Sequence, residues 1–575
     1  MTAATEPDSP SSCRVDAGPW AASVGYQQES ASLPRQVEPS SKKTKTSSSR
    51  AGGARHSVTL ALVICIFVAS YSLLDIDDLL LRVQTSLGHI PSPTAQTQQL
   101  GATISASEAL ATAQCQGGMQ RNSSTYREGP DNQQLADEDD DSAACVGRRI
   151  YIYKLPPQFN QKLIENCENQ QGWARMCYDL SNQGLGVPFD VPESDPLAHL
   201  LVPTSAWYKT NQFSLELLFH ERLKRYPCLT ENPDRATMSY IPFYSALDLT
   251  PKLFEASVAV RDQLSERLVG WLQSNSHWEK SRGNKHVMVL GRIVWDYVRP
   301  EKASQPGSWG NALVSLPEFW NVTKISIERN PWDSEQMAVP YPTSFHPSSD
   351  AEMVSWQSTI RTAQRDKLVV FVGSPRHNKV PGTELRYELV RQCSSTNPSE
   401  NNNNNNNNTT SQVSAGNQNS TCTMVLCNVV KCARNPQAPI RAFLESIFCL
   451  QPPGDSATRK SLFDCLLAGA IPVLFDNMTA AQQYQWHLPR DTASYAITID
   501  PKQVVAGELD VANKLLEVPK EVIATMQATI IDMLPRLIYK KPGPKLFEQS
   551  LTSSKDAFDH TIDRLLQKFH AHETV

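Results

Sequence analysis

Two adjacent cations, Arg459 and Lys460, lie where this sequence is best suited to bind a phosphate. They follow a Pro-Pro-Gly turn at 452–454, which ends an apolar run and precedes a segment with helical character. The first N–H groups of a helix lack backbone partners and carry a partial positive charge, so they bind anions. The sequence therefore predicts a diphosphate site, with Asp455 or Ser456 capping the helix.

The same stretch offers partners for the rest of a nucleotide. Ser456, Lys460 and Asp464 recur every four residues, so on a helix they would share one face. A diphosphate would contact Ser456 and Lys460, while Asp464 would accept a hydrogen bond from a ribose hydroxyl. The predicted binding residues are Arg376, Gly454, Asp455, Ser456, Arg459, Lys460 and Asp464. The alternative is that the two cations are surface charges paired with Asp455 or Asp464.

These residues need a scaffold, and the hydrophobic pattern predicts one. Runs rich in β-branched and aromatic residues predict strands at 150–153, 239–243, 286–290, 324–327, 368–372, 447–450 and 471–475. Apolar residues at helical spacing predict helices at 212–225 and 260–272, and a helix from 455 or 456 to about 467 that stops at Gly469. Arg376 follows the fifth of these strands and would reach the phosphates from a neighbouring loop. The alternation indicates an α/β fold with parallel sheets.

The composition divides the chain into several parts. They are a disordered cytosolic tail (1–57), a transmembrane signal-anchor (58–74), a lumenal stem (75–147), a first α/β domain on the acceptor side (148–340), a linker (341–366), and a second, donor-binding α/β domain (367–575) with an Asn-rich insertion (394–421). The linker is inferred from a proline- and aromatic-rich run at 339–347. Two α/β halves joined in this way predict two domains facing across a cleft, with a ligand at the carboxyl ends of the strands.

The anchor prediction rests on residues 58–74, which carry no charge over 17 residues, the lower limit for crossing a bilayer. Five lysines and arginines lie at 42–55, and three aspartates follow at 75–78. Positive charge stays on the cytosolic side, so about 500 residues would face a lumen. A cleaved signal peptide is the alternative, disfavoured because its charged region would exceed 50 residues.

The cysteines and the charge agree with a lumenal body that does not bind nucleic acid. Of the 13 cysteines, 11 follow the predicted anchor, where an oxidising compartment permits disulfides. Cys167 with Cys177 and Cys427 with Cys432 are plausible pairs, and the odd count leaves at least one cysteine free or paired between chains. Glycosylation sequons begin at residues 122, 321, 408, 419 and 477. The net charge of −5 gives no basic excess for nucleic acid.

Several motifs occur in a fixed order along the body. The longest is FCLQPPGDSATRKSLFDCLLAGAIPVLF at 448–475, and the shorter ones are IYIYKLP (150–156), TNQF (210–213), FH (219–220), IPFY (241–244), LD (247–248), GRIVWD (291–296), YPTSFHP (341–347) and YQWHLP (484–489). Over about 149–506 they resemble the exostosin-like glycosyltransferase family 47, in particular its plant-type xyloglucan galactosyltransferase branch. The resemblance implies a GT-B fold, two Rossmann-like domains facing across a cleft, with the donor in the C-terminal half.

The resemblance also implies an activity. It is an inverting transfer from a UDP-sugar, with galactose favoured, to a xyloglucan-like side chain, in the Golgi and without a bound metal or other cofactor. Alternatives are another UDP-sugar (arabinose, glucuronic acid, galacturonic acid or xylose), or a non-catalytic lumenal subunit in a complex with other Golgi transferases. The family usually has Arg at Lys460, where Lys would weaken bidentate phosphate contact, and Cys at Ala470.

An inverting transfer needs a general base at the acceptor hydroxyl and cations at the leaving diphosphate. Asp296 and Glu328 are the predicted bases, because each follows a predicted strand of the first domain. The alternative for Asp296 is a structural partner of Arg292 or Arg299. The alternative for Glu328 is a helix cap or an ion pair with Arg329.

Histidines and tryptophans complete the candidate residues. His220 is predicted to be a core histidine, and His346 and His487 are predicted to line the cleft. Tryptophans at 207, 295, 332 and 486 would stack on sugar rings or pack in the core. The acidic runs at 75–77 and 137–141 belong to the anchor boundary and the stem, so they are not predicted to bind a metal.

Overall fold

The computed structural model describes residues 143–169, 176–253, 257–299, 309–375, 383–395, 421–454, 456–542 and 554–571. The predicted tail, anchor and nearly all of the stem lie outside these ranges, as do residues 396–420 of the Asn-rich insertion. Among the described residues, no helix combines the length and the apolar character needed to span a bilayer.

The first lobe is built on a parallel five-stranded sheet. In sheet order its strands are β1 (Ile150–Ile152), β2 (Met238–Ile241), β3 (His286–Val289), β4 (Thr323–Ser326) and β5 (Gln336–Ala338). Its helices are α3 (Gln161–Glu165), α4 (Met176–Leu180), α6 (Leu215–Leu223), α7 (Ser245–Leu249), α8 (Val258–Gln273) and α9 (Ser276–Ser281). Helix α5 (Pro196–Leu200) falls within the same stretch of sequence but buries Leu197 in the apolar cluster of the second lobe. Buried residues fill all four positions of β2, β3 and β4, as expected of a sheet covered on both faces.

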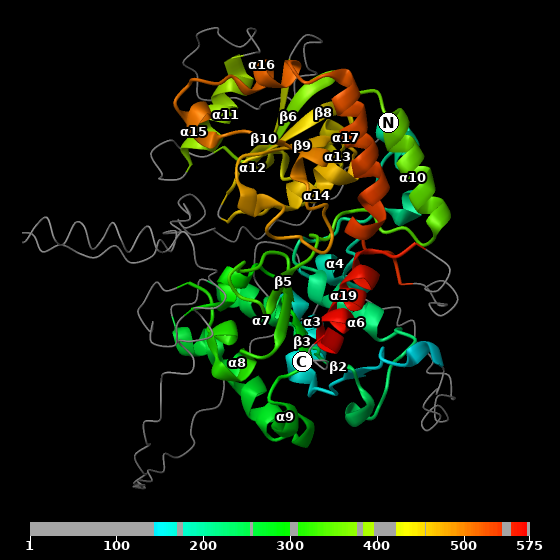
Figure 1. Ribbon diagram of the computed structural model, residues 1–575, viewed down its shortest axis with the longest axis vertical. Coiled ribbons are helices and arrows are strands. Elements are labelled where there is room, and N and C mark those ends of the chain that lie inside the picture. Colours follow the sequence, from blue (N-terminus) through cyan, green and yellow to red (C-terminus); the bar gives the residue numbers. More distant parts are fainter. Residues whose placement is uncertain are drawn as a thin grey trace, which may run out of the picture. The chain divides into compact units, whose positions relative to one another are not determined.

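The second lobe repeats this plan with the strand order β10-β9-β8-β6-β7. Its strands are β6 (Lys367–Gly373), β7 (Cys422–Leu426), β8 (Ser446–Gln451), β9 (Ile471–Leu474) and β10 (Ile497–Thr498), all paired in parallel. Its helices are α10 (Asp350–Thr362), α11 (Glu384–Ser395), α12 (Cys427–Val430), α13 (Gln437–Leu444), α14 (Lys460–Leu467), α15 (Pro501–Val505), α16 (Val511–Leu516) and α17 (Lys520–Met533). Figure 1 shows the two sheets with their surrounding helices. The predicted α/β class with two parallel sheets is therefore confirmed.

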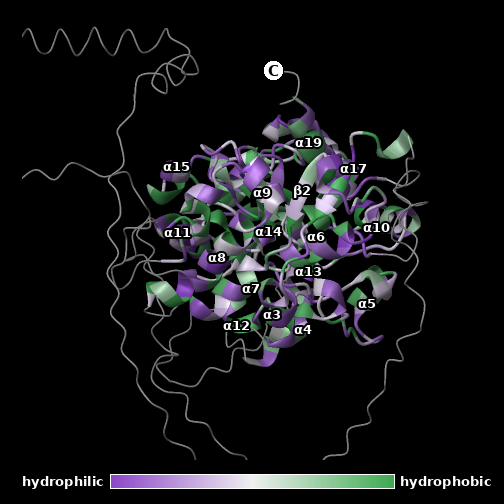
Figure 2. Ribbon diagram, turned by 90° about the horizontal axis from the view of Figure 1, so that it is seen from below, coloured by the Kyte–Doolittle hydropathy of each residue, from purple (hydrophilic) through white to green (hydrophobic). Residues whose placement is uncertain are grey.

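Apolar packing follows from these layers. In Figure 2 hydrophilic and hydrophobic residues share most helices, as expected of helices that bury one face. The largest apolar cluster is continuous from Val289 of β3 to Phe448 of β8, so the two lobes share one core. Each strand predicted from the sequence is present within one or two residues of its expected bounds. The short strands β5, β7 and β10 were not predicted.

The predicted linker at 341–366 contains a regular helix. Helix α10 buries Met353, Trp356 and Ile360, and the Trp356 indole donates a hydrogen bond to the Leu467 carbonyl at 2.9 Å. These side chains join the core on the second sheet. The segment is thus an element of the second lobe, and the prediction of a plain linker is wrong for 350–362.

The C-terminal helix α19 (Ala557–Ala571) returns to the first lobe, where Figure 1 shows it beside α6. Arg222 of α6 forms ion pairs with Asp556 and Asp559 in the buried interior. Lys568 forms an ion pair with Glu335, just before β5. The second predicted domain therefore ends before this helix, and the boundary at 575 is corrected accordingly.

Five disulfides join described cysteines: Cys145–Cys228, Cys167–Cys177, Cys393–Cys422, Cys427–Cys432 and Cys449–Cys465. Both predicted pairs are among them. The third joins the residues that flank the Asn-rich insertion, so the insertion leaves and re-enters the fold at one covalently closed point. Ten of the 11 cysteines that follow the predicted anchor are paired, and Cys115 lies outside the described residues.

Candidate functional site

A cavity of about 1160 Å³ lies beyond the carboxyl ends of β6 and β8. The first lobe contributes Lys209 to Ser214, which precede α6, and Ala246 and Leu247 of α7. The second lobe contributes residues from the loops that follow β6 and β8, and from α14. Parallel α/β sheets bind ligands at this edge of their strands. Both lobes thus contribute walls to one site.

Positive charge dominates the described walls of this cavity. The basic residues on it are Lys209, Arg386, Lys431, Arg434, Arg459 and Lys460. The acidic ones are Asp179 and Asp464. Six cations against two carboxylates in a partly desolvated space favour an anionic ligand such as a diphosphate. Among the described residues, no three His, Cys, Asp or Glu side chains gather as metal ligands would.

The loop at 452–459 differs from its prediction. Helix α14 begins at Lys460, and its N-cap residue Arg459 makes no capping hydrogen bond through its side chain. Ser456 therefore does not cap the helix and does not share a helical face with Lys460 and Asp464, which corrects the predicted geometry. Gly469 ends the helix region with φ +70°, as predicted.

Glu328 of the first lobe binds the loop that precedes α14. Its Oε2 accepts hydrogen bonds from the Ser456 hydroxyl at 2.7 Å, the Thr458 backbone N–H at 2.9 Å and the Thr458 hydroxyl. Its Oε1 accepts from the Trp295 indole at 2.8 Å. The carboxylate of the first lobe thus holds the 456–458 loop of the second lobe just before α14 begins.

Arg459 lies over Gly454 in this loop. A Cβ built on Gly454 would come within 1.6 Å of Arg459 Nη2. Arg459 Nη1 donates to the Thr458 carbonyl at 2.7 Å and to the Ser456 hydroxyl at 3.3 Å. Nη2 is buried and has no hydrogen-bond partner among the described residues. A buried guanidinium nitrogen without a partner, on a cavity wall, is suited to an incoming phosphate oxygen.

We predict that Gly454→Ala raises the KM for the donor about tenfold and leaves the fold intact. The new methyl group would displace the guanidinium of Arg459, which is the flexible end of its side chain, without removing the charge. A tenfold change corresponds to about 1.4 kcal/mol, the value of one charge-assisted hydrogen bond. Steady-state kinetics check this. The control is Gly270→Ala, because the added methyl group meets no atom within 4 Å. Gly507→Ala is unsuitable, because the positive φ of Gly507 (+72°) would strain an alanine.

Lys460 and Asp464 lie on the cavity wall and bind each other. Lys460 Nζ donates to both carboxylate oxygens of Asp464, at 2.6 and 2.8 Å. Burial raises the pKa of Asp464, and Lys460 partly offsets that rise. Lys460 therefore forms the ion pair with Asp464 that the alternative interpretation expected, and both residues also line the cavity. A ribose hydroxyl on Asp464 would share the carboxylate with Lys460.

Arg386 was not predicted. It lies near the start of α11, and its guanidinium donates to the carbonyls of Ser374, Pro452 and Pro453. It therefore joins the loop after β6 to the loop after β8, the two loops that frame the donor side of the cavity. The predicted ligands Arg376 and Asp455 lie outside the described residues.

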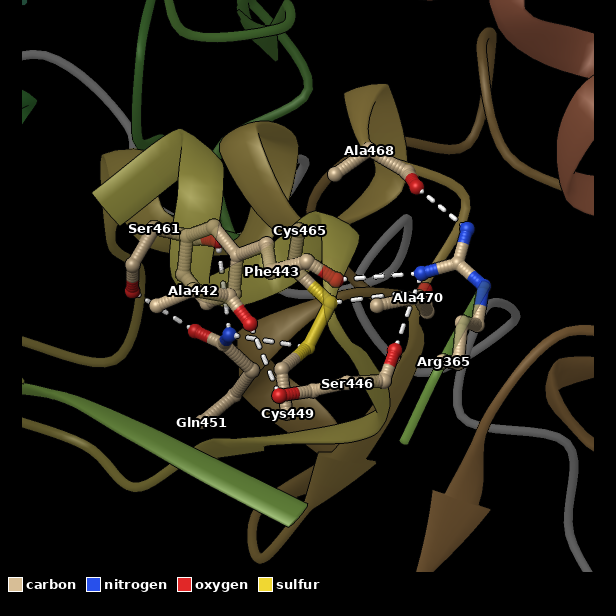
Figure 3. Close-up of a disulfide and its surroundings, with 10 residues drawn as sticks. All are labelled: Arg365, Ala442, Phe443, Ser446, Cys449, Gln451, Ser461, Cys465, Ala468 and Ala470. Atoms are coloured by element: carbon tan, nitrogen blue, oxygen red, sulfur yellow. Dashed lines mark hydrogen bonds between the residues drawn. A yellow bond between two sulfur atoms is a disulfide. The ribbon is translucent and has the colours of Figure 1, made fainter. Parts of the chain in front are cut away.

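A disulfide and an arginine hold α14 in place (Figure 3). Cys449 of β8 and Cys465 of α14 are bonded, so the helix that carries Lys460 and Asp464 is covalently attached to the strand beneath it. Arg365 donates to five carbonyls: Ile360, Phe443, Leu444, Ser446 and Ala468. Four of them lie at or near the ends of α10, α13 and α14, where carbonyl groups lack helical partners, and Ser446 is the first residue of β8. Burial lowers the pKa of Arg365 to about 10.

The two predicted bases lie off the cavity wall. Asp296 is 2% exposed and accepts from Arg292 Nε at 2.6 Å and from the Trp309 indole at 2.6 Å. This is the structural partnership with Arg292 that the sequence left open. Glu328 is 1% exposed and has the four hydrogen bonds given above. The geometry therefore supports a positioning role for both carboxylates and does not support a role as base.

Several of the histidines and tryptophans considered as cleft residues are buried in the core. His220 is buried and hydrogen-bonded to the Tyr244 hydroxyl at 2.6 Å, in agreement with a core histidine. His346 and His487 are fully buried and are not among the cavity-lining residues, so the prediction that they line the cleft is not supported. Trp207 belongs to the core, whereas Trp332 is 81% exposed.

Comparisons with known proteins agree with this architecture. The Exostosin GT47 domain matches residues 144–515. The chain is 37% identical to the probable xyloglucan galactosyltransferase GT12 of Arabidopsis thaliana over 75% of this chain and 78% of that protein. It is 35% identical to the xyloglucan galactosyltransferase XLT2 of the same plant, over 75% and 76%. A xyloglucan-specific galacturonosyltransferase of that plant is 36% identical, over 74% of this chain and 58% of that protein.

Proposed function

The chain belongs to the exostosin GT47 family of glycosyltransferases, and on that premise we propose that it transfers galactose from UDP-galactose to a xyloglucan side chain. The observation that carries this proposal is the cationic cavity to which both lobes contribute, with Arg459 and Lys460 at the start of α14. The two relatives named as xyloglucan galactosyltransferases support the sugar and the acceptor. The two parallel sheets fit the GT-B arrangement.

The chemistry follows from the walls of the cavity. The second lobe holds the diphosphate against Arg459 and Lys460, and Asp464 accepts from a ribose hydroxyl. The first lobe holds the acceptor, whose hydroxyl attacks the anomeric carbon from the face opposite the leaving UDP, so the configuration inverts. Cations fixed before the reaction stabilise the charge that develops on the diphosphate without reorganising. This role of side-chain cations is the basis for expecting activity without an added metal, which EDTA treatment tests.

Galacturonic acid is the second candidate sugar. One relative is named as a xyloglucan-specific galacturonosyltransferase, at an identity close to that of the galactosyltransferases. The cavity wall carries more cations than a diphosphate needs, since Lys209, Lys431 and Arg434 lie on it besides Arg459 and Lys460. A sugar carboxylate would find partners among them. Galactose remains favoured because more than one relative is named for it.

The proposed setting is the Golgi lumen, with residues 58–74 as a type II anchor and possible association with other transferases. The positive charges at 42–55 and the negative charges at 75–78 support this orientation. The five disulfides fit an oxidising compartment. Two measurements test this topology. The body should be protected from protease in intact vesicles, and glycans at Asn321 or Asn477 should be removed by a glycosidase.

The function is tested with the full chain purified in detergent. UDP-galactose, UDP-galacturonic acid, UDP-arabinose, UDP-glucuronic acid and UDP-xylose are each supplied with xyloglucan oligosaccharides, and both UDP release and the glycan product are measured. We expect a galactosylated oligosaccharide with UDP-galactose alone. A galacturonosylated product would show that galacturonic acid, and not galactose, is the sugar transferred. No product with any donor would overturn the proposed function.

A further inference from the structure

We propose that Asp179 is the general base that takes the proton of the acceptor hydroxyl, an inference that rests on the proposed transferase function. Of the described residues on the cavity wall, Asp179 is the one carboxylate that the first lobe contributes. The other described carboxylate on the wall is Asp464, which belongs to the donor side and is bound by Lys460. The base of an inverting transfer must lie on the acceptor side of the anomeric carbon.

The remaining buried carboxylates near α6 and β4 are enclosed. Glu216 is 0% exposed, and its Oε1 accepts from the Ser245 hydroxyl and from the backbone N–H groups of Ala246 and Gly291. Glu216 thus fixes the backbone of Ala246, which lines the cavity. Asp296 and Glu328 are bound by arginine, tryptophan and the 456–458 loop, as described above. An acceptor hydroxyl in the cavity reaches Asp179 without any rearrangement of these networks.

The neighbours of Asp179 fix its orientation. Asn211 Nδ2 donates to Asp179 Oδ2 at 2.7 Å, and Asn211 Oδ1 accepts from the Phe213 N–H at 2.9 Å. The backbone N–H decides which way the Asn211 amide faces, so its NH₂ group must point at the carboxylate. The disulfide Cys167–Cys177 anchors α4 two residues before Asp179. Asp179 lines the cavity, and its other oxygen, Oδ1, accepts no hydrogen bond from the described residues.

The charges around Asp179 suit a base. Burial raises the pKa of Asp179, while the hydrogen bond from Asn211 and the positive charge of Arg434 on the second lobe lower it in part. Lys209 of the first lobe and Lys431 of the second line the same cavity. A carboxylate whose pKa is raised binds a proton more readily than an ordinary one, and general-base catalysis improves as the pKa approaches the working pH.

In the proposed step the acceptor oxygen forms a bond to the anomeric carbon. The bond from that carbon to the β-phosphate oxygen breaks, and its electron pair leaves with UDP. The hydroxyl proton moves to Asp179 Oδ1. The leaving diphosphate is stabilised by Arg459 and Lys460 on the opposite wall.

The test compares Asp179→Asn with wild type and with Asp190→Asn, an exposed carboxylate that does not line the cavity. With UDP-galactose and xyloglucan oligosaccharide we expect Asp179→Asn to lower kcat by about 100- to 1000-fold. The KM for UDP-galactose should stay within about threefold, and the thermal shift produced by UDP should be unchanged. Asp190→Asn should match wild type, and Asp179→Glu should retain partial activity.

The pH profile gives a readout that a structural role would not move. The base acts when deprotonated, so kcat/KM falls as pH drops through the pKa of Asp179. This acid limb should lie above the ordinary aspartate value of about 3.9 and be absent in Asp179→Asn. Retention of more than a tenth of wild-type kcat, or loss of the UDP-dependent thermal shift in Asp179→Asn, overturns the inference. If wild type itself transfers no sugar, the proposed function fails and this inference fails with it.

Discussion

Glu328→Gln is expected to raise the KM for the UDP-sugar about 100-fold while kcat changes by less than about threefold. The carboxylate accepts from three donors of the 456–458 loop and from Trp295. A carboxamide of the same shape has one acceptor oxygen and one NH₂ group. Whichever way it turns, the NH₂ group faces either the Thr458 N–H or the Trp295 N–H, and neither of these can accept.

The size of this effect follows from the hydrogen bonds that are lost. The substitution removes at least one hydrogen bond and leaves the others with a neutral acceptor in place of a charged one, a combined loss of about 3 kcal/mol, which corresponds to about 100-fold in an equilibrium constant. The attachment of the loop that positions Arg459 to the first lobe is thereby weakened. Initial-rate kinetics over a range of UDP-galactose concentrations measure the effect, and Glu279→Gln on the exposed surface of α9 is the control.

The same variant separates two roles for Glu328. If Glu328 were the general base, as the sequence predicted, the substitution would lower kcat by about 100-fold or more and leave KM nearly unchanged. A positioning residue of the donor loop gives the opposite pattern. A loss confined to kcat would therefore contradict the structural assignment and restore the original prediction.

Arg365→Ala is expected to destabilise the protein by about 3 kcal/mol and lower the midpoint of thermal unfolding by roughly 5–10 °C. The guanidinium donates to five carbonyls, four at or near the ends of α10, α13 and α14 and one at the start of β8. Figure 3 shows the contacts with Phe443, Ser446 and Ala468. Water can replace only some of these hydrogen bonds because the site is part-buried. Arg365→Lys should recover part of the loss, since Lys keeps the charge but not the planar set of donors.

The control for this prediction is Arg361→Ala, four residues earlier on the same segment. Arg361 is exposed, and its ion pair with Asp532 spans 3.8 Å between side chains that are both more than half exposed. Such pairs contribute little, so the control should unfold within about 0.5 kcal/mol of wild type. Equal destabilisation by both substitutions would show that the carbonyl network of Arg365 has no special role. Scanning calorimetry of the full chain measures both.

Local patterns were sufficient to predict the α/β scaffold. The strands that supply the sheet centres are runs of buried β-branched and aromatic residues, so β3 and β8 could be predicted within a residue or two. Helix α10 has the same kind of signal, with Met353, Trp356 and Ile360 at helical spacing. The proline- and aromatic-rich run before it at 339–347 has no regular period, and it favoured a linker over the whole of 341–366. The strands β5 and β10 have three and two residues, too few to show a period.

The site was less predictable because long-range contacts decide it. Ser456 looked like a helix cap, and only the fold brings Glu328, 128 residues away, to its hydroxyl. The return of α19 to the first lobe depends on Arg222 meeting Asp556, 334 residues along the chain. Asp179 lies on a five-residue helix without a family motif, and nothing in its neighbourhood marks it as a cavity residue. Arg459 and Lys460 were predictable, because the turn, the glycine and the following helix are contiguous.

The most direct test of a nucleotide-sugar site in this cavity is the equilibrium binding of UDP to the full chain. Calorimetric titration compares wild type with Arg459→Ala and with Arg490→Ala, an exposed arginine of the second lobe that does not line the cavity. We predict saturable binding by wild type, at least tenfold weaker binding by Arg459→Ala, and wild-type binding by Arg490→Ala. Binding by Arg459→Ala that equals wild type, or no binding of UDP by wild type, would contradict the assignment of the donor to this cavity.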